Sequence, residues 1–151
     1  MIEKSLVLLK PDAIKRRLIG TIISRYEQKG LYIHRLKLLQ PSYELVAEHY
    51  AEHKSKSFYK KMVEYLSSNT VVAMVVAGED AVAAVRKLNG VTDPLNAELG
   101  SIRGDYGMCV GRNVVHGSES VEAGECEVRL WFGEDDGEVD VFDAQNIYEE
   151  D

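Results

Sequence analysis

The sequence is poor in cysteine and has no hydrophobic run long enough to span a membrane. Its two cysteines, Cys109 and Cys126, cannot build a disulfide framework and lack the spacing of a zinc site, so we expect reduced thiols in a cytosolic protein. The longest apolar run, residues 71–77, is far shorter than a bilayer requires. Residues 1–4 lead directly into a short apolar segment and are unlike a signal peptide. These absences predict a soluble, cytoplasmic protein with no membrane partner.

The common glycine-rich nucleotide-binding motifs are also missing. The sequence contains no Gly-x-x-x-x-Gly-Lys-Ser/Thr, which excludes a P-loop. It has no Gly-x-Gly-x-x-Gly after a predicted strand, which excludes a Rossmann dinucleotide site and the glycine loop of protein kinases. Any nucleotide that this protein binds must therefore be held by a different arrangement of residues.

Charge is distributed unevenly along the chain of 151 residues, whose formal net charge is −7. Residues 133–151 contain nine of the 25 acidic residues and no Lys or Arg, so residues 1–132 carry a net charge of +2. We therefore predict one folded domain over residues 1–132, followed by an acidic C-terminal tail over residues 133–151. The basic charge of the domain is too sparse to follow a nucleic-acid backbone, so no specific nucleic-acid partner is expected.

Hydrophobic periodicity predicts an α+β protein with alternating strands and helices. Apolar or β-branched runs predict strands over residues 5–10, 31–40, 71–77 and 106–110. Apolar residues at helical spacing, with Ser42 and Ser120 as N-caps, predict helices over residues 18–29, 42–53, 58–66, 81–88 and 120–132. The order predicts a ferredoxin-like fold, in which a four-stranded antiparallel sheet with a βαββαβ core has helices covering one face.

Two further features stand out within this pattern. Residues 90–104 contain Gly, Thr, Pro and Asn without periodicity, and a loop of this length in a compact domain is usually functional. Gly124 lies inside the last predicted helix, where it should cost about 1 kcal/mol relative to Ala.

His49 and His53 belong to a His-x-x-Glu-His pattern, which is typical of a class of zinc peptidases. On a helix the two histidines would share one face at a spacing that suits zinc. Those enzymes also need a third ligand on another element and a substrate cleft, for which the chain is too short. We therefore interpret the pattern as a solvated helical face and reject a zinc site.

The strongest concentration of chemical groups lies between Arg103 and Ser118. Two arginines, an asparagine and a histidine stand there among four glycines. Glycine allows the backbone to approach a ligand closely, and the planar guanidinium of arginine matches phosphate oxygens. A histidine that is mostly neutral near pH 7 has one ring nitrogen free to attack phosphorus. The residues alone fit either a phosphate-handling site or a glycine-rich turn with surface charges.

The segment Asn113-Val114-Val115-His116-Gly117-Ser118 resembles the Asn-x-x-His-Gly-Ser-Asp signature of nucleoside diphosphate kinases, with Glu119 in place of the usual Asp. Other segments resemble the same family in order and spacing. They are Leu9-Lys10-Pro11-Asp12-Ala13, residues 19–30, the helix with His49-Tyr50, residues 71–74, residues 100–105 and residues 111–113. The resemblance extends over residues 4–132 and rests on several independent motifs.

This resemblance implies a kinase that works by a ping-pong mechanism through a phosphohistidine on His116. The histidine would take the terminal phosphate of a nucleoside triphosphate, mainly ATP, and give it to a nucleoside diphosphate. Lys10 would contact the transferred phosphate and the ribose, Tyr50 would lie beside the histidine, and Glu127 would orient the imidazole. The remaining nucleotide contacts implied are Arg86, Thr92 and Arg103 to the phosphates, Asn113 to the ribose hydroxyls, and Phe58 and Val110 on either side of the base. From the pattern alone, core packing is the default for Phe58, and Glu127 could be an ordinary exposed acid.

The resemblance also implies a cofactor and an assembly. Mg²⁺ would arrive bound to the nucleotide phosphates, so no residue is expected to be a metal ligand. Family members are hexamers or tetramers, and the complete long loop favours a homohexamer here, with a tetramer as the alternative. The departures from the family pattern are Arg17 for the usual Gly, Ser57 for Pro, Asp93 and Leu95 in the loop, and a C-terminus without the usual Trp.

Two other functions are compatible with the same residues. A regulator that binds nucleotides or nucleic acid could have kept the fold and lost turnover, although every catalytic position is filled. A structural role could depend on the acidic tail alone, and it would then survive the loss of His116.

Overall fold

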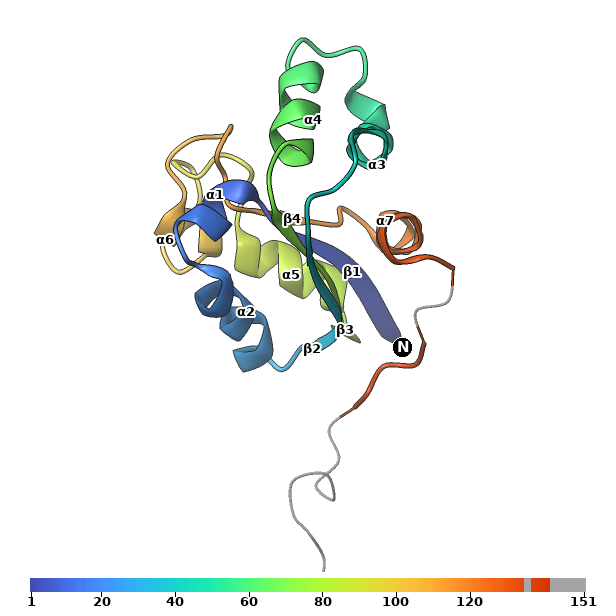
Figure 1. Cartoon of the computed structure of the whole chain (residues 1–151). Helices are drawn as coiled ribbons and strands as arrows, with labels where there is room; N and C mark the ends of the chain where they lie inside the picture. Colours follow the sequence, from blue (N-terminus) through green and yellow to red (C-terminus); the bar gives the residue numbers. More distant parts are fainter. Residues whose placement is uncertain (135–136, 142–151) are drawn as a thin grey trace, which may run out of the picture.

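The computed structural model describes residues 1–134 and 137–141. Its centre is a four-stranded antiparallel sheet in the order β2-β3-β1-β4 (Figure 1). The strands are β1 (Ile2–Leu9), β2 (Tyr32–Leu39), β3 (Val71–Glu79) and β4 (Val115–Gly117). The prediction of a ferredoxin-like α+β fold is confirmed. The register pairs Leu8 of β1 with His116 of β4, which places the histidine at one edge of the sheet.

Helices connect the strands and cover both faces of the sheet. They are α1 (Pro11–Lys15), α2 (Ile19–Gln28), α3 (Tyr43–His49), the 3₁₀ turn η1 (Ala51–His53), α4 (Tyr59–Ser67), α5 (Ala81–Asn89), α6 (Ile102–Tyr106) and α7 (Val121–Phe132). Among the described residues, no helix has both the length and the apolar character needed to cross a bilayer.

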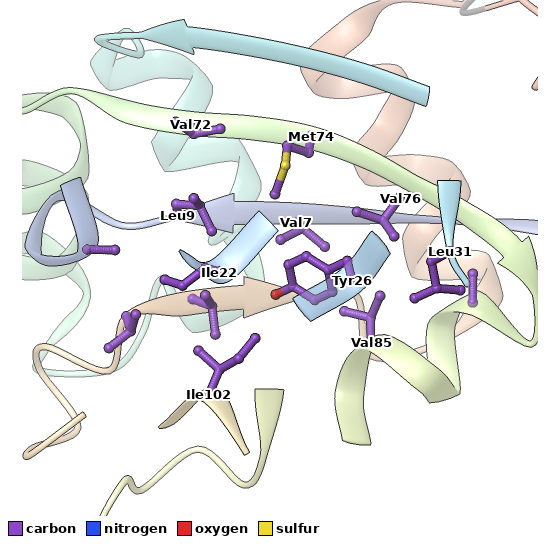
Figure 2. Packing of buried hydrophobic residues seen from close by; sticks show 14 residues of the cluster. Val7, Leu9, Ile22, Tyr26, Leu31, Val72, Met74, Val76, Val85 and Ile102 are labelled. Atoms are coloured by element: carbon purple, nitrogen blue, oxygen red, sulfur yellow. The ribbon is translucent and has the colours of Figure 1, made fainter. Parts of the chain in front are cut away.

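The core is divided by the sheet into two clusters, because successive side chains of a strand point to opposite faces. On one face, Val7 of β1 and Met74 of β3 pack with α2 and α5, and the ring of Tyr26 lies among them (Figure 2). On the other face, Leu6 and Leu8 pack with α3, α4 and α7. The expectation that helices cover a single face is therefore wrong. The nearly complete burial of β3 explains it, since both of its faces are apolar and both need cover.

Most predicted elements are confirmed within a few residues, and so are two of their caps. The side chain of Ser42 accepts a hydrogen bond from the amide of Leu45, and that of Ser120 accepts one from Ala123. These bonds satisfy amides that a helix leaves open at its first turn. The predicted helix over residues 42–53 is divided into α3 and η1 at Tyr50.

The last strand was predicted in the wrong place. Residues 106–110 form no strand. Residues 102–106 instead form α6, whose cap is Ser101, and the strand follows at Val115–Gly117. Met108 and Val110 are exposed, so the apolar residues that suggested a strand face away from the core. The long loop consequently ends at Ser101 rather than at Gly104.

Two backbone positions explain local sequence choices. Arg17 has a φ of 60°, in the left-handed region, which accounts for the glycine that the family usually has there. A Cβ atom on Gly124 of α7 would lie 2.4 Å from the carbonyl oxygen of Lys4. The glycine therefore allows α7 to lie directly on β1, beside the strand that carries His116.

Candidate functional site

A cavity of about 1170 Å³ opens where β1, α3, α4, α5, β4 and α7 converge. All ten residues that the sequence proposed for the site line this cavity: Lys10, Tyr50, Phe58, Arg86, Thr92, Arg103, Val110, Asn113, His116 and Glu127. They come from segments spread over most of the chain. The fold thus brings the whole predicted set to one place.

His116 lies on β4 with its side chain half-buried and its ring fixed from one side. Its Nε2 is 3.1 Å from Oε1 of Glu127 on α7. Because a carboxylate accepts, the tautomer that fits this contact carries its proton on Nε2. The lone pair is then on Nδ1, and Nδ1 is the nitrogen that can act as a nucleophile.

Glu127 is itself held in place by Ser118, the residue after β4, and indirectly by β1. The hydroxyl of Ser118 donates to Oε1 of Glu127 at 2.7 Å, and it accepts from the amide of Leu6 at 3.0 Å. Burial raises the pKa of Glu127, but the hydrogen bonds from His116 and Ser118 and the nearby histidines outweigh it, so the pKa is lowered overall. The carboxylate is therefore ionised while it orients the imidazole.

His49 and Trp131 belong to this group, although the sequence assigned neither to the site. The His49 ring stands edge-on to the His116 ring, with centroids 4.6 Å apart, and its Nδ1 accepts a hydrogen bond from Trp131 Nε1 at 3.1 Å. Burial, and to a lesser extent the electrostatic interaction with His116, lower the pKa of His49 to about 3, so His49 is neutral. The His-x-x-Glu-His pattern drew attention to His49, but only as a zinc ligand.

The structure gathers a different set of metal-binding atoms from the one in that pattern. Among residues 1–134 and 137–141, the one group of three or more such side chains is His49, His116 and Glu127, with ligand atoms within 4.8 Å of one another. His53 does not join it. Nδ1 of His49 already accepts from Trp131, and Glu127 is occupied by His116 and Ser118. His49, His116 and Glu127 are thus engaged in hydrogen bonds, and His53 of the zinc peptidase pattern lies outside the group.

Lys10 follows β1 and lines the cavity together with His116. Its Nζ donates to Oδ1 of Asn113 at 2.8 Å, and Nδ2 of Asn113 donates to the carbonyl of Thr92 at 3.1 Å. Burial and the positive charge of Arg103 lower the pKa of Lys10 to about 8, against the opposing charge of Asp12. Lys10 therefore remains mostly protonated near pH 7.

Arg103 has a role that the sequence did not predict. Its guanidinium donates to three backbone carbonyls, those of Asn113 at 3.2 Å, Gly90 at 2.7 Å and Val115 at 2.6 Å. The side chain thus ties the start of the long loop to the segment before His116. Arg86, on α5, is exposed at the cavity wall and has its charge available to a ligand.

Tyr50 presents a buried polar atom to the site. Its side chain is only 7% exposed, and its hydroxyl has no hydrogen-bond partner in the described part of the chain. Such an atom is costly unless something binds it. Burial raises the pKa of Tyr50, so the hydroxyl stays protonated and can donate to a ligand.

Two apolar side chains are exposed at the rim of the cavity. Phe58, which immediately precedes α4, is 48% exposed, and Val110 is 54% exposed. The structure therefore turns Phe58 outward rather than into the core, the alternative that the sequence left open. Exposed apolar groups at a cavity rim suit a planar ring that packs against them.

Known proteins of similar sequence and structure were found over nearly the whole chain. The family model described as nucleoside diphosphate kinase matches residues 3–137. A protein of that name from Methanobrevibacter smithii is 47% identical, over 99% of this chain and 100% of its own. The apo crystal structure of the nucleoside diphosphate kinase from Encephalitozoon cuniculi superposes with a TM-score of 0.91 at 48% identity, over 97% of this chain and 99% of the other. The Halobacterium salinarum enzyme in complex with CDP superposes with a TM-score of 0.88 at 42% identity, over 99% and 100%.

Proposed function

The chain belongs to the nucleoside diphosphate kinase family, and from this premise we propose that His116 carries the phosphate in a ping-pong transfer whose main donor is ATP. The chain is an enzyme that transfers phosphate between nucleotides. The observation that supports His116 is its hydrogen bond through Nε2 to Glu127, which leaves Nδ1 as the free nucleophile inside the cavity.

The reaction consists of two displacements at phosphorus. In the first, the Nδ1 lone pair attacks the γ-phosphorus of ATP, an N–P bond forms, and the P–O bond to the β-phosphate breaks with its electron pair leaving on ADP. In the second, a terminal oxygen of a nucleoside diphosphate attacks the same phosphorus, a P–O bond forms, and the N–P bond breaks with its electron pair returning to Nδ1. The imidazole gains positive character while it carries the phosphate, and the ionised Glu127 at Nε2 stabilises that charge.

The cavity offers cations and donors for the phosphates. Phosphoryl transfer depends mainly on charge stabilisation and alignment. A cation about 4 Å from a phosphate oxygen gains about 4 kcal/mol at an effective dielectric near 20. Lys10, Arg86 and Arg103 supply this charge, with the hydroxyls of Tyr50 and Thr92 as neutral donors, and Asn113 takes the ribose hydroxyls.

Mg²⁺ is proposed as the cofactor, carried by the nucleotide. The described residues contain no group of carboxylates arranged for a hard cation, and the three-residue group at His116 is already hydrogen-bonded. Phosphate oxygens are the ligands that Mg²⁺ prefers in such sites. When bound there, it would neutralise charge on the transferring group, while the side chains of this chain orient the nucleotide around it.

The base is proposed to lie between Phe58 and Val110. Contact with a ring face is tolerant of base identity, because every base has such a face. This supports the use of several nucleoside diphosphates. The two exposed free thiols, Cys109 and Cys126, support a cytoplasmic location.

A homohexamer is the proposed assembly, with a tetramer as the alternative. Exposed apolar side chains support an association of copies. They lie on edge strand β2, at Leu36 and Leu38, and in the loop before α6, at Val91, Leu95 and Leu99.

Labelling with γ-³²P-ATP tests the central proposal. The wild-type protein should acquire an acid-labile, base-stable phosphate, and addition of GDP should release it as GTP. His116→Ala should acquire none, whereas the control His34→Gln, on β2, should be labelled like the wild type. Tight nucleotide binding by the wild type without any label would favour the binding regulator and contradict the phosphohistidine.

A further inference from the structure

Val114 has a backbone conformation that branched residues rarely adopt. Its φ is 77°, and the amide of Val115 donates to the carbonyl of Asn113 at 2.9 Å, which makes residues 113–115 a γ-turn of the positive-φ form. The side chain is completely buried. A strained turn of this kind persists only if the surrounding structure imposes it. It stands between Asn113, proposed at the ribose, and His116.

Both polar groups of Val114 are held by one segment at the start of the chain. The carboxylate of Asp12 accepts from the Val114 amide through Oδ2 at 3.0 Å. The amide of Lys10 donates to the Val114 carbonyl at 2.9 Å. Asp12 and Lys10 therefore fix the turn from both sides, at more than a hundred residues' distance along the chain.

Tyr65 links Asp12 to α4, the helix that follows Phe58. Its hydroxyl donates to Oδ1 of Asp12 at 3.1 Å, so the two carboxylate oxygens divide between the tyrosine and the turn. The guanidinium of Arg112 lies 3.7 Å from the centre of the Tyr65 ring and keeps it in place. Burial and the charge of Asp12 raise the pKa of Tyr65 to about 12, so the hydroxyl remains a donor.

We propose that Asp12 and Tyr65 are positioning residues for phosphoryl transfer, which hold the strained turn at Val114 and so align His116 and Asn113 with the nucleotide bound beside α4. This inference rests on the proposed role of His116. Neither residue needs to touch the substrate. Their effect comes from the sensitivity of an in-line displacement to small errors in the position of the nucleophile.

A merely structural role would give a different result. If Tyr65 only stabilised the fold, removing its hydroxyl would lower the melting temperature and leave the rate of transfer in the folded protein unchanged. If it positions the turn, the rate of the chemical step falls while nucleotide affinity is preserved, because the phosphate and base contacts are intact.

The test compares Tyr65→Phe with Tyr59→Phe. Both remove one hydroxyl from α4, but that of Tyr59 donates to the carbonyl of Ala47, whereas that of Tyr65 donates to Asp12. Quenched-flow labelling with γ-³²P-ATP measures the rate of enzyme phosphorylation, and calorimetric titration with ADP measures affinity. We expect phosphorylation to slow about 10-fold in Tyr65→Phe with affinity within about twofold, and to be unchanged in Tyr59→Phe.

A double-mutant cycle with Val114→Gly isolates the strain. Glycine adopts a φ near 77° without steric cost, so the turn should then depend less on Asp12 and Tyr65. We expect the loss from Tyr65→Phe to shrink to less than about threefold in the Val114→Gly background. An equal loss in both backgrounds, or wild-type phosphorylation in Tyr65→Phe, overturns the proposal. The role of His116 is tested separately, by identifying the residue that carries the label in the wild-type protein. The ratio of phosphorylation rates between variant and wild type can be measured whichever residue carries the phosphate.

Discussion

Lys10 carries a positive charge that we propose contacts the phosphates, and its buried site disfavours that charge. Its pKa of about 8 predicts that kcat/KM, which reflects the free enzyme, falls about 10-fold between pH 7 and pH 9 as Lys10 loses its proton. Bound phosphates raise the pKa of Lys10, so kcat should fall less over this range. Steady-state assays of transfer from ATP to GDP at several pH values measure both constants.

The lowered pKa of Lys10 affects stability in the opposite direction, since loss of its proton lowers activity but favours the folded state. The pKa of Lys10 is lowered on folding from 10.5, so between about pH 8 and 10.5 the unfolded chain binds more protons, and the contribution of Lys10 to stability rises with pH. Activity and this part of the stability therefore change in opposite directions. A flat kcat/KM profile from pH 7 to 9 would contradict the assignment.

His49 predicts a sensitivity to acid. Its pKa falls from 6.5 to about 3 on folding, because burial and His116 disfavour its charge. Between these values the unfolded state takes up a proton that the folded state cannot, so the contribution of His49 to stability falls by about 1 kcal/mol per pH unit as the pH is lowered. Urea unfolding at fixed chain concentration, at pH 7, 6, 5 and 4, measures this slope.

The matched variants are His49→Gln and His53→Gln. In the first, the glutamine side chain would still offer an oxygen to Trp131 but could not titrate, so the slope should decrease. His53→Gln, one turn further along, should keep the wild-type slope. Equal slopes in all three proteins would show that another group causes the acid sensitivity.

At the scale of elements, we expect alanine to be less favourable than glycine at position 124, although alanine is usually the better residue inside a helix. Propensity alone makes Gly124→Ala stabilising, but the added Cβ would meet the carbonyl oxygen of Lys4 at 2.4 Å. We expect a loss of about 1–3 kcal/mol from overpacking. Glu127 lies on the same helix, α7, and contacts His116. A shift of α7 should therefore displace Glu127 and also slow phosphoryl transfer.

Gly20 is the control for this change. It lies in α2, and a Cβ there has no neighbour within 4 Å. Gly20→Ala should therefore stabilise the protein by about 0.5–1 kcal/mol and leave transfer unchanged. Thermal unfolding and the transfer assay on both variants measure these effects. Stabilisation by both substitutions would show that α7 does not depend on close contact with β1.

The elements themselves could be predicted where their signals are local. Ser42 and Ser120 indicated their helices because a cap depends on residues three positions apart. β4 could not be found, because three residues carry too little periodicity. Its place depends on Lys10 and Asp12, which contact the turn before it from the other end of the sequence.

In the site, too, some residues could be predicted from the sequence, whereas the contacts that support them could not. The ten residues implied by family resemblance all reach the cavity, since motifs record which side chains are needed. The supporting contacts of Trp131 with His49, Tyr65 with Asp12, and Arg103 with three carbonyls were not predicted. Each joins segments by geometry that only the folded chain defines.

At the scale of the whole molecule, β2 is an edge strand with an apolar surface. Leu36 and Leu38 are 54% and 63% exposed and stand two residues apart, so they share one face. Edge strands that remain exposed usually carry charges that prevent pairing. β2 carries Arg35 and Lys37, but the two exposed leucines beside them support the proposed association with another copy of the chain.

Substitution of both leucines by lysine should therefore disrupt the assembly. Burying two ammonium groups between copies is unfavourable, while the separate chain, in which these positions face solvent, should still fold. Native mass spectrometry should give six chains for the wild type and fewer for Leu36→Lys/Leu38→Lys, whereas Tyr43→Lys, an exposed position on α3, should retain the wild-type mass. A wild-type mass in the double variant would place the contacts elsewhere, for instance in the loop with Leu95 and Leu99. Because the cavity residues of one chain line a single pocket by themselves, the dissociated variant should keep measurable phosphorylation of His116, so that assembly and chemistry can be tested apart.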